Sequence, residues 1–348
     1  MAEFNMRDQL TLLELAKRTN NQALMTIVEV LEETNEWLED AIWLEANQAM
    51  SHITTQRTSV PTGTWRKLNE GVAPEASSTK QITEGIGILE AYSRVDKLLA
   101  ELSGNVNQFR SGEDKAFITG LSEELSKVMF TDETGSATIA LPYGTIDNHP
   151  ERFNGLPARL DDAGLFNVHP MGSAQALTND TSIYIVQWGE GMVHMTYPKG
   201  SPTMGVVHEN LGEQTIEASG TYAAPQLMQA LVSHFKLHAG LVVRDDRCIR
   251  RIPGFKTSMV KGVTYSFHDT THPGHHKLIE ALNALPYNGV GAKIYCNKTI
   301  KTQMDILAID KGNVMYSIEN WSGRPITTFR GVPVRRVDAI KNAENRLS

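Results

Sequence analysis

The sequence has very little cysteine and no excess of positive charge. Only two cysteines, Cys248 and Cys296, occur among its 348 residues, and they lie far apart. This usage is typical of two half-buried thiols in a reducing compartment, although a disulfide between them stays open as an alternative. The formal net charge of −7 argues against direct nucleic-acid binding as the main role, because neutralising the phosphates requires a basic excess or patch.

Long apolar runs are also missing. No charged segment followed by an apolar stretch opens the chain, so we expect no signal peptide. No run approaches the roughly 20 apolar residues that a membrane-spanning helix needs, so we expect no membrane contact and synthesis in the cytosol. The content of 41% hydrophobic and 21% charged residues nevertheless predicts a mostly globular chain with a substantial core.

Familiar catalytic motifs are lacking too. Gly85-Ile-Gly87 has no third glycine, and the patterns GxxxxGKS/T, GxSxG and HExxH do not occur. The acid pairs Asp161-Asp162 and Asp245-Asp246 would point to opposite faces of a strand, so surface solvation or turn capping explains them better than acid–base catalysis. We therefore predict that the chain is not an enzyme and has no catalytic residue, no cofactor and no metal ligand.

One histidine-rich segment is the main alternative to that prediction. It contains His268, Asp269, His272, His275 and His276. On a continuous helix His272 and His276 would share a face and could bind a metal ion. Pro273-Gly274 lies between them at an expected helix start, which favours a polar loop and helix cap. A contact that titrates near neutral pH is the third possibility.

The first fifty residues have helical periodicity. Apolar residues recur at helical spacing over 10–17 and again over 23–47, which predicts two helices. The polar side of the second helix is acidic and contains no lysine or arginine. This side is either a solvated surface or a face that contacts a basic partner. A basic partner would offset the repulsion between like charges four residues apart on a helix. Its acidic residues are Glu29, Glu32, Glu33, Glu36, Glu39, Asp40 and Glu45.

A polar segment from about Ser51 to Gln81 is the most distinctive part of the sequence. Residues 54–58 and 64–68 have the composition of strands, with proline and glycine between and after them. A hairpin of this kind buries too little apolar surface to offset the entropy of ordering it. We therefore expect a surface outside its own domain to hold it. Trp65, flanked by Arg66 and Lys67, is the expected anchor, and local packing is the alternative.

The remainder of the chain has patterns of both helices and strands. The spacing predicts a long helix over about 105–130 and a helix over 224–239 that begins near Pro225 and ends at Gly240. This order of elements indicates an α+β or α/β protein. The other expected helices are 95–102, 272–284 and 299–308, and the expected strands are 182–188, 192–196, 241–243, 292–296, 314–318, 326–329 and 332–334.

Eight segments together make the chain resemble the major capsid proteins of short-tailed phages of the epsilon-fifteen type. No one segment is specific, but their number and order over nearly the whole length support the resemblance. The segments are Leu10–Lys17, Trp65–Val72, Ile86–Asp96, Glu113–Phe117, Phe153–Pro157, Ser182–Gly189, Tyr197–Gly200 and Phe329–Ile340.

This resemblance implies the α+β fold of the Hong Kong 97 capsid protein. Residues 1–50 would then form an N-terminal helical arm and residues 51–92 an extended loop, called the E-loop. A peripheral domain would follow at 93–218, with the spine helix at about 105–130. An axial domain would occupy 219–325, and 326–348 would return to the peripheral domain.

The resemblance further implies a major capsid protein that assembles into the icosahedral shell around phage double-stranded DNA. Partners would be other copies in hexamers and pentamers, with Trp65, Arg66, Lys67 and Leu68 at a contact between subunits. Scaffolding, portal and decoration proteins are further partners that such a role allows, and DNA would be enclosed without strong specific binding. The location would be the virion, after assembly in the host cytoplasm. An encapsulin-like compartment and a soluble oligomeric α+β enzyme are the alternatives.

Overall fold

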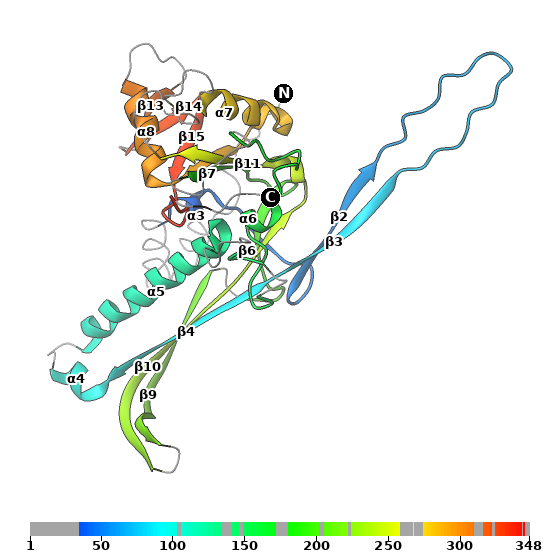
Figure 1. Cartoon of the computed structure of the whole chain (residues 1–348). Coiled ribbons are helices and arrows are strands. Elements are labelled where there is room, and N and C mark those ends of the chain that lie inside the picture. The colour runs from blue at the N-terminus through cyan, green and yellow to red at the C-terminus, as the bar shows by residue number, and fades with distance from the viewer. Residues whose placement is uncertain are drawn as a thin grey trace.

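Two large sheets, one long helix and a projecting hairpin dominate the part of the chain that the structure describes (Figure 1). The computed structural model describes residues 35–102, 106–133, 141–145, 149–171, 180–201, 205–221, 224–257, 267, 274–309, 316–321, 324–342 and 344. These elements confirm the predicted mixture of helix and sheet. The predicted helix 10–17 and the first part of the predicted helix 23–47 lie outside the described residues.

The polar segment forms a long hairpin that extends away from the body (Figure 1). Its strands are β2 (Ser51–Ser59) and β3 (Ser78–Gly85), so the strand predicted at 54–58 is confirmed. Pairing runs from Ser51 with Gly85 to Ser59 with Ser78. Residues 64–68, also predicted as a strand, lie in the connecting segment 60–77, which contains no strand. Pro61 and Pro74 lack the N–H that would extend the ladder into this segment.

A five-stranded sheet carries the root of the hairpin. Its strand order is β1-β8-β10-β4, and β9 pairs with β10. The ring of Phe117 on α5 (Val106–Phe130) stacks on the ring of Phe235 in β10, with 6.0 Å between their centroids. The helix predicted at about 105–130 is therefore confirmed, and it packs on one face of this sheet. The strands are β1 (Trp43–Glu45), β4 (Gly87–Asp96), β8 (Val193–Tyr197), β9 (Val206–Thr221) and β10 (Ala224–Val243).

The predicted helix 224–239 is wrong, because this segment is the first part of the 20-residue strand β10. The same residues also alternate with period two, and Phe235, Leu237 and Ala239 are all buried. Partners occupy the backbone of β10: β4 pairs with residues 230–239 and β9 with residues 224–237. These tertiary ladders override the local helix preference of alanine, leucine and methionine.

The predicted helix 23–47 is wrong beyond Asp40. Within its described part, helix is confined to α3 (Trp37–Asp40), and Ala41 is extended. Trp43 to Glu45 then form β1, parallel to β8, with Trp43 opposite Met195. The available edge of β8 provides backbone partners that the helical spacing could not reveal.

A six-stranded sheet forms the second half of the body, in the order β11-β7-β12-β15-β14-β13. The strands predicted at 182–188, 292–296, 326–329 and 332–334 are confirmed within it, as are two helices close to the predicted 272–284 and 299–308. The strands are β7 (Asp180–Gln187), β11 (Ile249–Lys256), β12 (Ala292–Cys296), β13 (Tyr316–Trp321), β14 (Arg324–Phe329) and β15 (Val332–Arg336). The helices are α7 (Gly274–Asn283) and α8 (Lys298–Ile309).

Short elements complete the described chain. The helix predicted at 95–102 is confirmed as α4 (Lys97–Leu102). The others are β5 (Asp132–Glu133), β6 (Leu141–Pro142), α6 (Leu156–Arg159) and the 3₁₀ turns η2 (Asp246–Cys248) and η3 (Pro286–Gly289).

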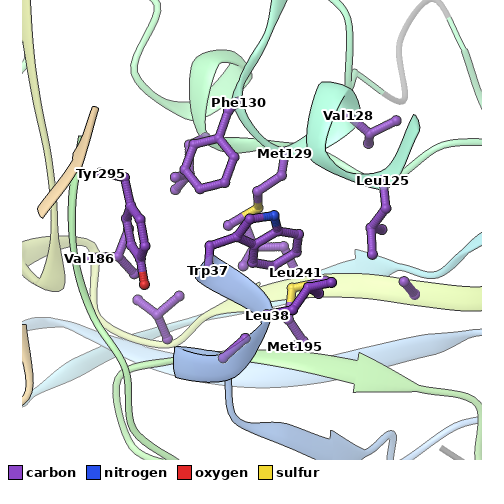
Figure 2. Packing of buried hydrophobic residues seen from close by; sticks show 14 of the residues in the cluster. Trp37, Leu38, Leu125, Val128, Met129, Phe130, Val186, Met195, Leu241 and Tyr295 are labelled. Atoms are coloured by element: carbon purple, nitrogen blue, oxygen red, sulfur yellow. The ribbon is translucent and has the colours of Figure 1, made fainter. Parts of the chain in front are cut away.

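An aromatic cluster joins α3, the end of α5 and both sheets (Figure 2). The ring of Phe130 lies 5.7 Å from Trp37 and 5.5 Å from Tyr295, measured between centroids. The indole N–H of Trp37 donates to Ser126 Oγ at 2.9 Å, and that of Trp188 donates to the Tyr295 hydroxyl at 2.7 Å. The two indole N–H groups are therefore hydrogen-bonded inside the core, where α3, the end of α5 and both sheets meet.

Candidate assembly surface

A buried ion pair fixes the root of the hairpin to the body. The Arg159 guanidinium donates to both oxygens of Glu84 in β3, at 2.8 and 2.6 Å, and also to the carbonyl of Leu241 in β10 at 3.1 Å. The Glu84 side chain is only 5% exposed. Two parallel charge-assisted hydrogen bonds set orientation as well as distance. This pair therefore determines the direction in which the hairpin leaves the sheet.

Two histidine side chains pack against each other at β2, the other strand of the root. His52 in β2 packs edge-on against His194 in β8, with 5.5 Å between ring centroids. Burial lowers the pKa of His194 to about 4, and His52 and Arg244 add to this effect. Burial also lowers the pKa of His52, where Arg244 adds to the effect and Glu84 opposes it. Both rings are thus held in a site that favours their neutral form.

Further hydrogen bonds tie the root to its surroundings. The side-chain amide of Gln56 donates to the carbonyl of Val243 at 3.3 Å. Asn47 binds both backbone groups of Ile53: its carbonyl oxygen accepts from the N–H at 2.9 Å, and its NH₂ donates to the C=O at 2.7 Å. The root is therefore anchored by β8, β10, α6 and the segment that precedes β2.

The far end of the hairpin has no such support. We call residues 60–77 the tip. All of them are exposed, including Trp65 at 101% and Leu68 at 91%. The Glu75 carboxylate accepts from the backbone N–H groups of Thr62 and Gly63 at 3.0 and 3.1 Å. Arg66 donates to the carbonyl of Glu70 at 3.1 Å. These bonds shape the tip but bury no apolar surface.

The predicted contact residues Trp65, Arg66, Lys67 and Leu68 therefore lie together at the tip. Among the described residues Trp65 is the most exposed large apolar side chain. A local core does not surround it, which removes local packing within the protomer as an explanation. Contact with a second copy stays a prediction.

The acidic side predicted near residue 40 meets basic partners. Asp40 accepts from Arg335 at 3.1 Å and lies 3.5 Å from the Lys293 ammonium. Glu39 lies 3.4 Å from Arg335, and Glu36 lies 3.7 Å from Lys301. For these three residues the alternative of a basic partner face is confirmed, and the partner is the six-stranded sheet and α8 of the same chain. Glu29, Glu32 and Glu33 lie outside the described residues.

The histidine-rich segment is only partly described. His275 and His276 lie in the first turn of α7 with their rings edge-on, 5.3 Å apart, and burial lowers the pKa of His275. His268, Asp269 and His272 lie outside the described residues. In the part of the chain that the structure describes, three or more histidine, cysteine, aspartate or glutamate side chains nowhere gather as they would around a metal ion.

The other candidate residues have structural positions. Asp245 caps η2 by accepting from the N–H of Arg247 at 3.0 Å, and Asp162 accepts from the N–H of Gly164 at 2.7 Å, as expected for turn capping. Cys248 and Cys296 are buried free thiols, so the alternative of a disulfide is wrong. Within the described ranges no helix is long and apolar enough to cross a membrane.

The anchoring residues of the root were not predicted. Glu84, Arg159, His52 and His194 come from four separate segments, and none belongs to a recognisable motif. A weak signal was present at Glu84, because this carboxylate shares a face of β3 with Ile82, the one large apolar residue of that strand.

Comparisons with known proteins agree with this architecture. The family model of the major capsid protein GP7 matches residues 19–348. A solved structure of bacteriophage Epsilon15 is 26% identical, with 88% of this chain and 87% of that chain covered and a TM-score of 0.59. The capsid of bacteriophage JBD30 is 10% identical, with 87% and 90% covered and a TM-score of 0.46. No curated protein sequence matches the chain.

The family match spans almost the whole chain, and the Epsilon15 structure shares its mixed helix-and-sheet fold. The resemblance to the epsilon-fifteen type and the Hong Kong 97-like fold class are therefore confirmed. The chain belongs to the major capsid protein GP7 family and is a phage major capsid protein that builds an icosahedral shell.

Proposed function

We propose that copies of this chain join through the projecting hairpin, whose tip lies on a neighbouring copy in the hexamers and pentamers of a closed shell. The observation that carries the proposal is the contrast along the hairpin. Its root is fixed by the buried Glu84–Arg159 pair, whereas Trp65 at the tip is fully exposed. A rigid support with an unburied aromatic at its end is suited to filling a pocket on a partner.

The shell would enclose phage double-stranded DNA without binding it tightly. The net charge of −7 supports this role, because a tightly bound duplex would require basic residues to neutralise its phosphates. The family role is structural, and we propose that the chain acts without catalysis. We also propose assembly in the host cytoplasm, with scaffolding, portal and decoration proteins as further partners.

We propose that the division into domains follows the two sheets. We assign α5 and the five-stranded sheet to the peripheral domain, and the six-stranded sheet with α7 and α8 to the axial domain. The hairpin and β4 would form the E-loop and its return at 51–92. Under this assignment β10 belongs to the peripheral domain. The range 219–325, predicted from the sequence for the axial domain, would instead place β10 in the axial domain. The ranges 1–50, 93–218 and 326–348 stay predictions.

Removal of the tip tests the proposal. Residues 60–77 would be replaced by Asn-Gly, which closes a two-residue hairpin between the paired Ser59 and Ser78. Since the tip contacts only itself, we expect a soluble protomer with unchanged circular dichroism that forms no closed shells by negative-stain electron microscopy. Trp65→Ala should have a milder effect of the same kind. Normal shells from the tip-deleted protein would contradict the proposed role.

A further inference from the structure

An apolar pocket opens between α5 and the five-stranded sheet. Its volume is about 200 Å³. Leu125, Val128, Phe153 and Leu237 form its buried apolar floor, and Ile88 at its side is 51% exposed. An exposed isoleucine beside a hollow of this size leaves apolar surface in water, and filling the hollow with an apolar group would be favourable.

The charged residues of the lining are two carboxylates and one guanidinium. Arg152 is directed to Tyr143: its guanidinium lies 3.9 Å from the ring centre and donates to the Tyr143 carbonyl at 2.8 Å. The Glu151 side chain is 58% exposed and lies 3.2 Å from His149 and 3.9 Å from Arg152.

Glu124, the second carboxylate, accepts from the Tyr143 hydroxyl and lies 3.7 Å from Lys127. Lys127 lies outside the lining, so the lining itself has one more negative than positive charge, and the exposed side of Glu151 can accept a further cation.

The tip of the hairpin has the complementary chemistry. Trp65 is fully exposed and is followed directly by Arg66 and Lys67. An apolar cavity of about 150 Å³ is enough for a benzene ring, so a pocket of about 200 Å³ has room for the larger indole. The two cations would then lie near the two carboxylates of the lining. Tryptophan and arginine are also the residues that most often dominate binding energy at interfaces.

The tip of the same chain cannot reach this pocket. The wall of the pocket begins at Gly87, two residues after Gly85, which pairs with Ser51 at the root of the hairpin. The segment 60–77, which contains Trp65 and connects β2 to β3, lies at the far end of the hairpin, away from that root (Figure 1). An indole in the pocket must therefore come from a second copy.

We propose that this pocket receives Trp65 of a second copy, with Arg66 and Lys67 of that copy beside Glu124 and Glu151. The inference rests on the proposed function, in which the tip contacts a neighbouring copy, and it names the surface that the tip contacts.

Cross-linking between two variants tests the contact. Copies with Thr64→Cys, which keep Trp65, would be mixed with copies carrying Ile88→Cys, assembled, and treated with a short bifunctional maleimide. Cys248 and Cys296 are both 0% exposed and should not react. We expect dimers on a denaturing gel only when both variants are present. A matched control replaces Ile88→Cys by Ile306→Cys on α8, where the side chain is 47% exposed, and should give at least tenfold less dimer.

Two results would overturn the inference. One is normal shells without cross-linking at position 88, in which case the proposed function stands and the pocket is wrong. The other is equal cross-linking at positions 88 and 306. If the wild-type protein forms no shells through its tip, the proposed function fails and the pocket fails with it.

Charge reversal provides a second test with a different readout. Arg66→Glu with Lys67→Glu should slow shell assembly, followed by light scattering. Adding Glu151→Lys to the same chain should restore the rate in large part. Glu123→Lys is the matched control, because Glu123 is an exposed residue of α5 outside the lining. Equal rescue by both lysines would indicate a general charge effect and would refute the specific contact.

Discussion

Acid should destabilise the chain through His194. This side chain is 1% exposed, and neither of its ring nitrogens has a hydrogen-bond partner among the described residues. Its pKa is about 4, against 6.5 for an unperturbed histidine, mainly because of burial and further because of His52 and Arg244. The unfolded chain therefore binds a proton at a pH where the folded chain does not.

The size and sign of the loss in stability follow from the pKa of His194 in the folded chain and in the unfolded chain. A difference of one pKa unit corresponds to about 1.4 kcal/mol, so the interval from 6.5 to about 4 is worth about 3 kcal/mol of unfolding free energy. This stability is fully present above pH 6.5 and is lost as pH falls towards 4. At pH 5 about 2 kcal/mol should be lost. His52, whose pKa is also lowered, should act in the same direction.

Urea unfolding of the unassembled protein at pH 7.5 and pH 5 measures this loss. His194→Phe keeps a ring of similar shape and removes the titration, so the variant should lose about 2 kcal/mol less than the wild type between the two pH values. His238→Gln, a change at another histidine of the same sheet, should lose as much as the wild type. An equal loss in the wild type and His194→Phe would refute the assignment of the acid sensitivity to His194.

Two further predictions concern the anchoring of the root and the packing beside α5. Glu84→Gln should cost about 3–5 kcal/mol of unfolding free energy, because it leaves the Arg159 guanidinium without its buried partner, and limited proteolysis should cut the hairpin root sooner. A loss below about 1 kcal/mol would contradict this. Gly155→Ala should cost about 1–3 kcal/mol, since its Cβ would lie 2.0 Å from the carbonyl oxygen of Val128. Its control, Gly120→Ala on the exposed side of α5, meets no atom within 4 Å and should raise the melting temperature, corresponding to about 0.5–1 kcal/mol.

The sequence was most informative where one physical signal acted alone. The helix α5 has a long apolar stripe and no competing strand pattern, so its bounds agreed with the prediction to one residue. The exposure of Trp65 was also predictable, because the polar segment around it has too few apolar residues to cover it, although the strand predicted at 64–68 did not form. For the helix and for the exposure of Trp65, local composition was sufficient, and no distant segment was needed to decide the outcome.

Predictions failed where distant segments decided the conformation. Residues 224–239 satisfy a helical and an alternating pattern at once, and only the ladders from β4 and β9 select the strand. The acidic side near Asp40 left two alternatives open, because its partner Arg335 is almost 300 residues away in the chain. Pairing partners at such separations cannot be deduced from one sequence.

The same reasoning explains why one side of the proposed contact was predictable and the other was not. Trp65 and its two cations are consecutive residues, so their chemistry can be read directly. The pocket is assembled from β4, α5, residues 151–153 and β10, and each of these segments looks like ordinary core in the sequence. A hollow left where four packed segments meet is a property of their side-chain shapes in space. A search for assembly contacts should therefore take the exposed anchor from the sequence and the site that receives it from the structure.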